Sequence, residues 1–356
     1  SVLGFLRYVP LSVLHGLAAC ASYISYHCRL SIYRSIQANL ILVHPKMPDA
    51  QRQKLAKQIL KNQLISAVDS LKTWAMPPKW SIAQIKTVHH EDILIKALAN
   101  PSGMLAIVPH IGTWEMMNAW LNTFGSPTIM YKPIKNAAVD RFVLQGRERL
   151  NASLVPTDAS GVKAIFKTLK AGGFSIILPD HVPDPSGGEI APFFGIKTLT
   201  STLASKLAAK TGCALVGLSC IRREDGDGFE IFCYELNDEQ LYSKNTKIAT
   251  TALNGAMEQM IYPHFLHYMW SYRRFKHTPL LNNPYLLNEN ELKKIAIKLQ
   301  SHVKRIVMSD TNYIICKKWG TKYGAEYVNR LYNMGKRNLT LPFTMVCLTD
   351  NSTGHS

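Results

Sequence analysis

Residues 105–115 read Leu105-Ala-Ile-Val-Pro-His110-Ile-Gly-Thr-Trp-Glu115, and the fold of the chain can be worked out from them. Met104–Val108 is a short apolar run, which is typical of a buried strand. Pro109 cannot donate a hydrogen bond to a sheet and should end that strand. Thr113 has the residue type of a helix N-cap, and a helical pattern follows at 114–121. We therefore predict a strand, a short loop and a helix.

His110 and Glu115 are the chemically active residues of this stretch. If all six residues from His110 to Glu115 were helical, the two side chains would be about 140° apart and could not meet. With His110 on the loop and Glu115 in the first helical turn, the carboxylate can accept a hydrogen bond from one imidazole nitrogen and leave the other as a base. Removing a proton from an alcohol needs this arrangement. The spacing is equally compatible with a helix-start glutamate and an unrelated histidine.

Composition narrows the class of partner. The chain has 356 residues, 47% of them hydrophobic, which suits a main domain with a large core and some additions. Its net charge of +17 indicates an anionic partner: nucleic acid, a phosphorylated metabolite, an acidic protein or an anionic bilayer. The basic residues are spread out and no nucleic-acid motif accompanies them, so we expect no nucleic acid. Seven cysteines without a C-x-x-C spacing favour a reducing compartment.

The N-terminal segment is free of Lys, Arg, Asp and Glu from Tyr8 to Cys28. As a helix, this length would span roughly 31 Å, about one hydrocarbon thickness. Polar residues such as His15 interrupt it. We predict a membrane anchor within residues 1–30, either spanning the bilayer or lying in its interface; the alternative is a buried helix of a soluble protein. The heavier basic flank, Arg29 and Arg34, would place the rest of the chain in the cytoplasm.

The middle of the chain alternates between strand and helix patterns, which predicts an α/β fold with a mixed sheet flanked by helices. Asp225-Gly-Asp-Gly228 between two apolar runs indicates a hairpin. The predicted strands are 128–131, 174–178, 214–222 and 229–235, and the predicted helices are 48–74, 160–169, 200–210 and 248–261.

Beyond Pro279 the composition changes. Leu280–Asn290 holds four Asn and a Pro, typical of a linker, and Glu291–Val307 has the pattern of an amphipathic helix. A strand at 312–316, a helix at 324–337 and a strand at 342–348 would form a small α/β segment, similar to the start of a nucleotide-sugar glycosyltransferase. The predicted organisation is an anchor (1–30), a main domain (31–279), a linker with a helix (280–310) and a partial α/β segment (311–356). Because the chain starts without Met and stops within this segment, we expect a piece of a longer protein.

Four blocks, in this order and spacing, resemble the late acyltransferases of lipid A biosynthesis, a branch of the lysophospholipid acyltransferase superfamily. The resemblance covers roughly residues 3–279 and implies a glycerol-phosphate acyltransferase-like fold. The blocks are His110–Glu115; Met130-Tyr-Lys-Pro133 with Gly146-Arg-Glu-Arg149; Leu178-Pro-Asp-His-Val-Pro-Asp184 with Ala191-Pro-Phe-Phe-Gly195; and Tyr268-Met-Trp-Ser-Tyr-Arg-Arg-Phe-Lys276.

The resemblance implies an enzyme at the inner membrane that transfers a fatty acyl group from acyl carrier protein to a hydroxyl of a lipid A precursor. In the H-x-x-x-x-E (HX4E) motif, His110 matches the general base and Glu115 the carboxylate that orients it. Attack on the thioester is direct, so no cofactor and no acyl-enzyme residue are needed, which agrees with the lack of a G-x-S-x-G motif.

The same resemblance suggests residues that bind the substrate. Backbone amides at the start of the 114–121 helix and Arg147 are candidates for stabilising the thioester oxyanion, and Arg147 could instead hold a phosphate. Lys132 stands where an Arg is common, and Asp180 where a carboxylate supports the acceptor site and the base. Arg149, Arg273 and Arg274 complete the predicted binding residues, the last two as a cluster for carrier protein or lipid phosphates. The alternatives are a salt-bridging Arg147, a turn-capping Asp180 and a solvated basic face. His181 and Asp184 match no zinc pattern, so we expect no metal.

Two rival functions stay open at this point. The same fold could serve a phospholipid acyltransferase or another glycolipid acyltransferase. Alternatively, the domain could be an inactive glycolipid-binding module that serves the C-terminal segment.

Overall fold

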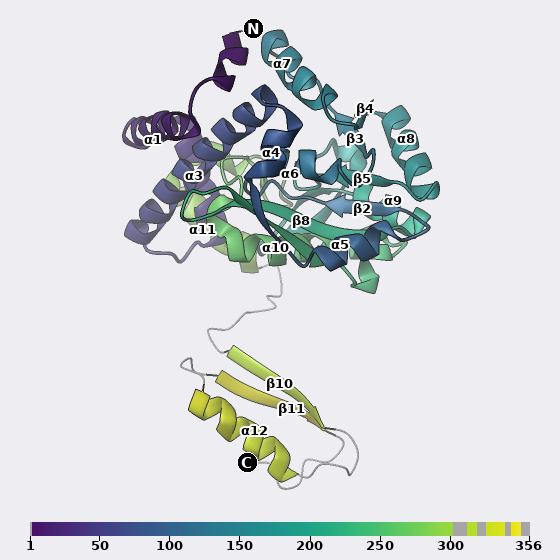
Figure 1. Ribbon diagram of the computed structural model, residues 1–356. Helices are drawn as coiled ribbons and strands as arrows, with labels where there is room; N and C mark the ends of the chain where they lie inside the picture. The colour runs from purple at the N-terminus through teal and green to yellow at the C-terminus, as the bar shows by residue number, and fades with distance from the viewer. Residues whose placement is uncertain (1, 302–311, 319–324, 339–342, 350–356) are drawn as a thin grey trace. The chain divides into compact units, whose positions relative to one another are not determined.

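The computed structural model describes residues 2–301, 312–318, 325–338 and 343–349 (Figure 1). The chain divides into two compact units, Ser1–Val303 and Lys304–Ser356.

The first unit is built on a seven-stranded sheet with the order β1-β9-β8-β2-β5-β3-β4. Its strands are parallel except for the antiparallel β8–β9 pair, so the predicted mixed sheet and the predicted hairpin are confirmed. The strands are β1 (Ile85–His89), β2 (Met104–Ile107), β3 (Thr128–Tyr131), β4 (Ser153–Pro156), β5 (Phe174–Ile177), β8 (Ala214–Arg222) and β9 (Phe229–Glu235).

Helices cover both faces of this sheet (Figure 1). Strand β2 shows why its sequence is continuously apolar: Leu105 and Ile107 enter one core cluster and Met104 and Ala106 the other. The α-helices of this unit are α1 (Leu11–His27), α2 (Ser31–Val43), α3 (Asp49–Ala75), α4 (Pro78–Gln84), α5 (Glu91–Leu98), α6 (Trp114–Leu121), α7 (Ala137–Glu148), α8 (Ala159–Lys170), α9 (Leu203–Thr211), α10 (Thr246–Ile261) and α11 (Glu289–Ser301).

One predicted helix begins in the wrong place. The pattern predicted helix from Thr200, but Ile196–Ser201 is strand β7, which pairs antiparallel with β6 (Gly188–Phe193), and α9 starts only at Leu203. The side chains of Thr198 and Thr200 are completely buried, and the Thr198 hydroxyl donates to the carbonyl oxygens of Arg274 and His277. Tertiary contacts thus hold this β-branched run in an extended conformation.

The expected membrane-spanning anchor is not supported. In the described part of the chain, we find no helix that is both long and apolar enough to cross a bilayer. The charge-free stretch instead follows η1 (Val2–Arg7) and forms a short break and then α1 (Leu11–His27). Helix α1 packs on α3, with Leu14 and Ala18 buried and His15 Nε2 hydrogen-bonded to Asp69 Oδ1 at 2.7 Å. His15, Ser22 and Ser25 therefore face protein, whereas Ser12 is exposed.

The described part of the segment predicted as a linker, residues 280–301, belongs to the first unit and packs within it. It contains η5 (Pro284–Leu286), where Tyr285 donates its hydroxyl to Asn39 Oδ1 at 2.5 Å. Helix α11 follows and packs on α2, and Gln300 Nε2 donates to the carbonyl oxygens of Leu42 and Val43. The predicted helix ended at Val307, and its last residues lie outside the described part of the chain.

The second unit contains the predicted strand–helix–strand order. Its elements are β10 (Asn312–Lys318), α12 (Ala325–Asn338) and β11 (Phe343–Thr349), and β10 pairs with β11 in parallel. Parallel neighbours require a crossover connection, which α12 provides.

Candidate active site

His110 lies on a loop at the end of β2 that is fixed from three sides. Its carbonyl accepts from Met269 N–H at 2.9 Å, Gly112 N–H donates to the His267 carbonyl at 2.9 Å, and Thr113 N–H donates to the Cys220 carbonyl at 2.9 Å. A Cβ at Gly112 would lie 2.0 Å from the Cys220 carbonyl oxygen, and the residue has φ +62°. Only glycine fits there, so the loop that presents the histidine has one sequence-determined shape.

The carboxylate bonded to the His110 ring is that of Asp180. Its Oδ1 lies 2.8 Å from His110 Nδ1, and its Oδ2 accepts the backbone N–H of His110 at 3.0 Å. Asp180 follows β5, the strand beside β2, so parallel pairing brings the two strand ends together. This arrangement replaces the expected hydrogen bond between His110 and Glu115.

The electrostatics of this pair fix the tautomer of the imidazole. Burial alone would raise the pKa of the Asp180 carboxyl, but the neighbouring His110 ring and the hydrogen bonds hold that pKa well below its ordinary value. An ionised carboxylate can only accept, so Nδ1 of His110 carries the shared proton. Nε2 then keeps its lone pair, as a general base requires.

A second histidine, which the sequence analysis considered only as a metal ligand, stacks on the first. The ring centroids of His181 and His110 are 4.0 Å apart, and the angle between the ring planes is 7°. Tyr272 also stacks on His181, with 4.3 Å between the ring centroids. Desolvation and the adjacent His110 lower the pKa of His181 to about 4, so its ring is neutral at pH 7. The stack limits rotation of the His110 ring.

Glu115 occupies the first turn of α6 as predicted, but its partner is Arg147 of α7. The guanidinium of Arg147 also lies over the rings of Trp114 and Tyr131, at 5.0 and 5.3 Å from their centroids. Its Nε is buried without a hydrogen-bond partner among the described residues. Arg147 is thus held firmly and keeps one donor free.

His110, Glu115 and Arg147 line one cavity of about 470 Å³. Lys132 lines it as well, whereas Asp180 lies behind His110. Most of the remaining wall is apolar, and includes Trp74, Ile129, Val143, Ile177, Leu178 and Leu203. The cavity therefore combines a small polar end with a surface that suits a hydrocarbon chain.

A buried ionic network packs against the loop that carries His110, and the sequence analysis missed it. Asp69 of α3 pairs with Arg222 of β8, accepts from His15 of α1 and lies 3.5 Å from the hydroxyl of Thr113. Its side chain is fully buried. These residues are scattered over more than 200 positions of sequence, so no local pattern predicts their contact.

Three predicted binding residues lie elsewhere. Arg149 donates to the carbonyl of Met76 at 3.0 Å, at the end of α3. Arg274 is buried and donates to the Leu199 carbonyl at 2.6 Å and to the Thr200 hydroxyl, so it supports β7. Arg273 is exposed and lies 3.5 Å from the Ser35 hydroxyl of α2.

A histidine–aspartate pair at the end of a sheet strand, beside a largely apolar cavity lined by Arg147 and Lys132, is typical of an enzyme with a lipid-like substrate. Residues 1–277 match the family of bacterial lipid A biosynthesis acyltransferases, and the chain belongs to that family. The protein is therefore an acyltransferase.

Curated relatives agree with this assignment. The chain is 26% identical to a lipid A biosynthesis lauroyltransferase of Escherichia coli, over 78% of this chain and 90% of the relative. It is 22% identical to a lipid A biosynthesis palmitoleoyltransferase of the same organism, over 68% and 78% of the two chains. A shorter match, 28% identical over 40% of this chain and 47% of the relative, is to a phosphatidylinositol mannoside acyltransferase of Mycolicibacterium smegmatis.

Proposed function

We propose that this protein transfers a fatty acyl chain from acyl carrier protein to a hydroxyl group of a lipid A precursor, with His110 as the general base. The observation that carries the proposal is the bond between His110 Nδ1 and Asp180, which leaves Nε2 as the basic nitrogen of a ring that lines an apolar cavity. The family and the names of two relatives, both lipid A biosynthesis acyltransferases, supply the class of acceptor.

In the proposed reaction, one proton moves from the acceptor hydroxyl to His110 and then to the leaving thiolate. His110 Nε2 takes the proton of the acceptor hydroxyl as the oxygen attacks the thioester carbonyl carbon. The carbonyl oxygen becomes an oxyanion; when it collapses, the carbon–sulfur bond breaks and the thiolate leaves with the proton from the imidazolium. The products are an ester and a free thiol, and Asp180 stabilises the charged ring between the two transfers.

Arg147 is the donor that we favour for the oxyanion. The amides of Gly112 and Thr113, at the start of α6, already donate to the carbonyls of His267 and Cys220. Arg147 has a buried Nε without a partner among the described residues and is fixed by Glu115. In this proposal Glu115 positions Arg147, and Lys132 at the mouth attracts an anionic group of either substrate.

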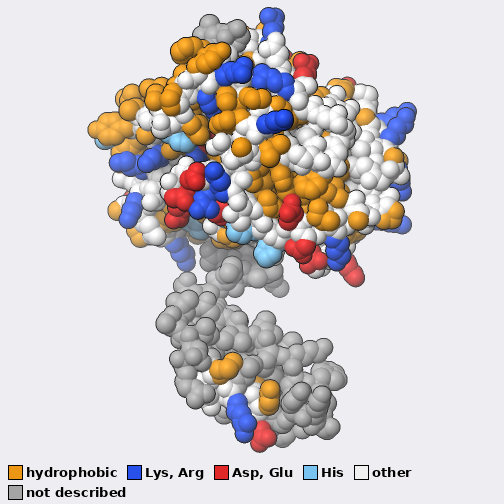
Figure 2. All heavy atoms as spheres, in the orientation of Figure 1, with side chains coloured by type: hydrophobic (Ala, Val, Ile, Leu, Met, Phe, Trp, Pro, Cys, Tyr) orange, Lys and Arg blue, Asp and Glu red, His pale blue; other side chains and the backbone are white. Residues whose placement is uncertain are grey.

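The surface charge and the N-terminal helix support the partners. A net charge of +17 suits an acidic carrier protein and an anionic bilayer. Phe5, Tyr8, Val13, Leu17 and Ile24 are all at least half exposed on η1, α1 and the turn between them. Figure 2 shows hydrophobic side chains gathered in that region, with Lys and Arg side chains close by. We propose that this face lies on the cytoplasmic surface of the inner membrane, as interfacial helices do.

Acylation of a different glycolipid is the second candidate, because one relative is a phosphatidylinositol mannoside acyltransferase. An assay with both acceptors separates the two. The full chain is incubated with acyl carrier protein thioesters of graded length and either a lipid A precursor or a phosphatidylinositol mannoside, and products are read by mass spectrometry. Addition of one acyl group to the lipid A precursor is the expected result.

The catalytic residue is tested in the same assay. We expect His110→Ala to lower turnover at least ~10²-fold, since a positioned general base contributes on that order. Full activity in this variant would refute the mechanism, and no mass gain with any donor would favour the inactive glycolipid-binding module.

A further inference from the structure

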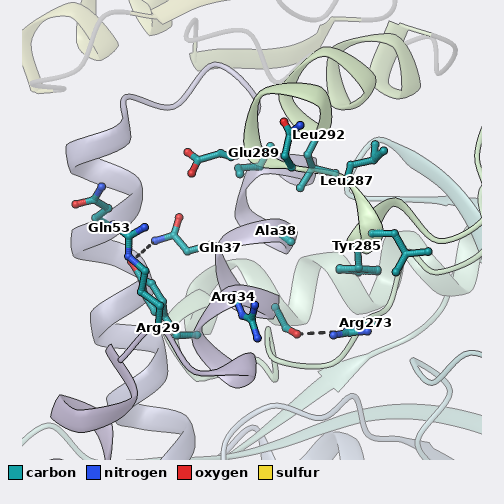
Figure 3. A pocket seen from close by; sticks show the side chains of 15 residues that line it. Arg29, Arg34, Gln37, Ala38, Gln53, Arg273, Tyr285, Leu287, Glu289 and Leu292 are labelled. Atoms are coloured by element: carbon teal, nitrogen blue, oxygen red, sulfur yellow. Dashed lines mark hydrogen bonds between the residues drawn. The ribbon is translucent and has the colours of Figure 1, made fainter. Parts of the chain in front are cut away.

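A second cavity, of about 490 Å³, lies between α2 and the segment that runs from η5 into α11 (Figure 3). It shares no lining residue with the cavity at His110. Arg29, Arg34 and Arg273 line it, and they come from the end of α1, from α2 and from the loop after η4 (Tyr262–His267). Three guanidinium groups from separate segments therefore meet around one space.

The positive charge of this second cavity is not neutralised locally. Its one acidic lining residue is Glu289, and that carboxylate pairs with the buried Arg52 and, at 3.3 Å, with Lys293. Neither Arg29 nor Arg34 forms an ion pair within the part of the chain that the structure describes. The cavity thus presents unpaired cations to a ligand.

Helix α2 adds to this potential. Its residues Tyr33, Gln37 and Ile41 line the cavity along one face, and its first turn contains no acidic side chain. The N-cap is Leu30, which offers no capping oxygen. The positive end of the helix dipole therefore lies on the same side as the arginines and favours an anion there.

The segment from η5 into α11 lines the second cavity with apolar side chains beside the polar Asn288 and Glu289. Leu287 and Leu292 line it together with Leu286, whose surface is 77% exposed. Exposed Ile24 and Leu30, at 56% and 45%, lie before and after Arg29 in the sequence. A ligand that fills this space meets cations at one end and hydrocarbon at the other.

We propose that the second cavity binds the phosphate of an anionic phospholipid, with the first part of an acyl chain against Leu286 and Leu287. Arginine suits this role because its planar donors match phosphate oxygens. The site also has a connection to the active site: Tyr272 stacks on His181, and the next residue, Arg273, lines the second cavity. The inference does not depend on the proposed acyl transfer, because it concerns binding alone.

The test uses the full chain and three probes in isothermal titration calorimetry. The probes are dihexanoyl phosphatidylglycerol below its critical micelle concentration, dihexanoyl phosphatidylcholine and inorganic phosphate. We expect the phosphatidylglycerol to bind at least about tenfold more tightly than either of the others, because only it combines net charge with acyl chains. Equal affinity for the two lipids would overturn the proposal, and phosphate bound as tightly as phosphatidylglycerol would show a free-anion site instead of a lipid site.

Two variants separate the polar and apolar contacts. Arg34→Gln should weaken binding of phosphatidylglycerol and of phosphate about tenfold, whereas Leu286→Ser should weaken only the lipid. Both residues are exposed, so circular dichroism and melting temperature should match the wild type. Arg141→Gln, an exposed arginine of α7 that lines neither cavity, is the matched control.

The active-site variant His110→Ala should bind phosphatidylglycerol normally, whether or not it retains acyl transfer. Unchanged lipid affinity in Arg34→Gln or in Leu286→Ser would contradict the assigned site.

Discussion

At the scale of single residues, the acid that fixes the base is distant in sequence. His110 and Glu115 are five positions apart and share a cavity, but the ring bonds to Asp180, 70 positions away. Glu115 instead holds Arg147. The two carboxylates therefore have separate partners: Asp180 orients the His110 ring and Glu115 orients the Arg147 guanidinium.

Substitution of each carboxylate tests this division. We expect Asp180→Asn to lower kcat by ~10²-fold or more with little change in KM, because the tautomer and the charge that stabilises the imidazolium are lost. Glu115→Gln should act through Arg147 and change KM for the acceptor or donor as well. Steady-state kinetics on both variants decide the matter. If Glu115→Gln removed kcat while Asp180→Asn kept it, the assignment of the two acids would be reversed.

The sequence predicted the strand and the helix around His110 because their signals are local, whereas Arg147 and Asp180 were predicted only from the family resemblance. Apolar runs, Pro109 and Thr113 mark β2 and α6 within a residue of their observed ends. The pairing of Asp180 with His110, and of Asp69 with Arg222, depends on which strands become neighbours. That order is set by packing of the whole sheet and leaves no periodic trace in the sequence.

At the scale of elements, the turn at Gly112 joins β2 to α6 against the end of β8. An added Cβ would collide with the Cys220 carbonyl, and φ is already +62°. We expect Gly112→Ala to lower stability by more than about 1 kcal/mol and to reduce activity, since the His110 loop must shift. Urea unfolding and turnover measure the two effects.

The matched control for this change is Gly255→Ala on α10, where an added Cβ meets nothing within 4 Å. A helix-interior alanine should raise stability by up to about 1 kcal/mol and leave activity unchanged. Equal behaviour of the two variants would mean that the loop at Gly112 is more adaptable than its contacts indicate.

Helix α10 is also the site of a pH-dependent contact with the β6–β7 hairpin. Glu258 Oε1 accepts the backbone N–H of Phe194 at 2.8 Å, and burial raises the pKa of its carboxyl to about 7. Between pH 4.5, the ordinary pKa of a glutamate, and pH 7, the folded state binds more protons at this carboxyl than the unfolded state does. This contribution to stability is therefore full below about pH 4.5 and is lost as the pH rises through 7.

We expect Glu258→Gln to remove that part of the pH dependence, because the amide can still accept from Phe194 but does not titrate. The urea midpoint should differ between pH 5 and pH 8 in the wild type, and this difference should be smaller in the variant. A wild-type difference that survives in Glu258→Gln would assign the effect to another group.

At the scale of the whole molecule, the N-terminal helix is tied to the catalytic loop. His15 of α1 and Thr113 of the loop both approach Asp69, and Lys72 donates to the carbonyls of Leu6, Arg7 and Val9. His15 makes its contact from the side of α1 that faces the protein, and the apolar side chains of Val13, Leu17 and Ile24 are exposed on this helix. The charge-free segment that was predicted to span a membrane thus forms a helix that packs on α3.

We predict that the exposed apolar face of α1 binds the membrane. Leu17 and Ile24 are 60% and 56% exposed and lie on the same side of α1. If the face enters the bilayer interface, the double change Leu17→Glu and Ile24→Glu should weaken binding to anionic vesicles more than about tenfold, since each buried aliphatic side chain contributes roughly 1.5–3 kcal/mol.

Sedimentation with vesicles of phosphatidylglycerol and phosphatidylcholine measures this effect, and Ile95→Glu on α5, 48% exposed in the wild type, controls for the added charge. Raising the salt concentration should weaken the wild type further, because basic residues contribute to attraction. Equal vesicle binding by the double variant and the Ile95→Glu control would place the membrane contact on another face, and α1 would then be a purely structural helix.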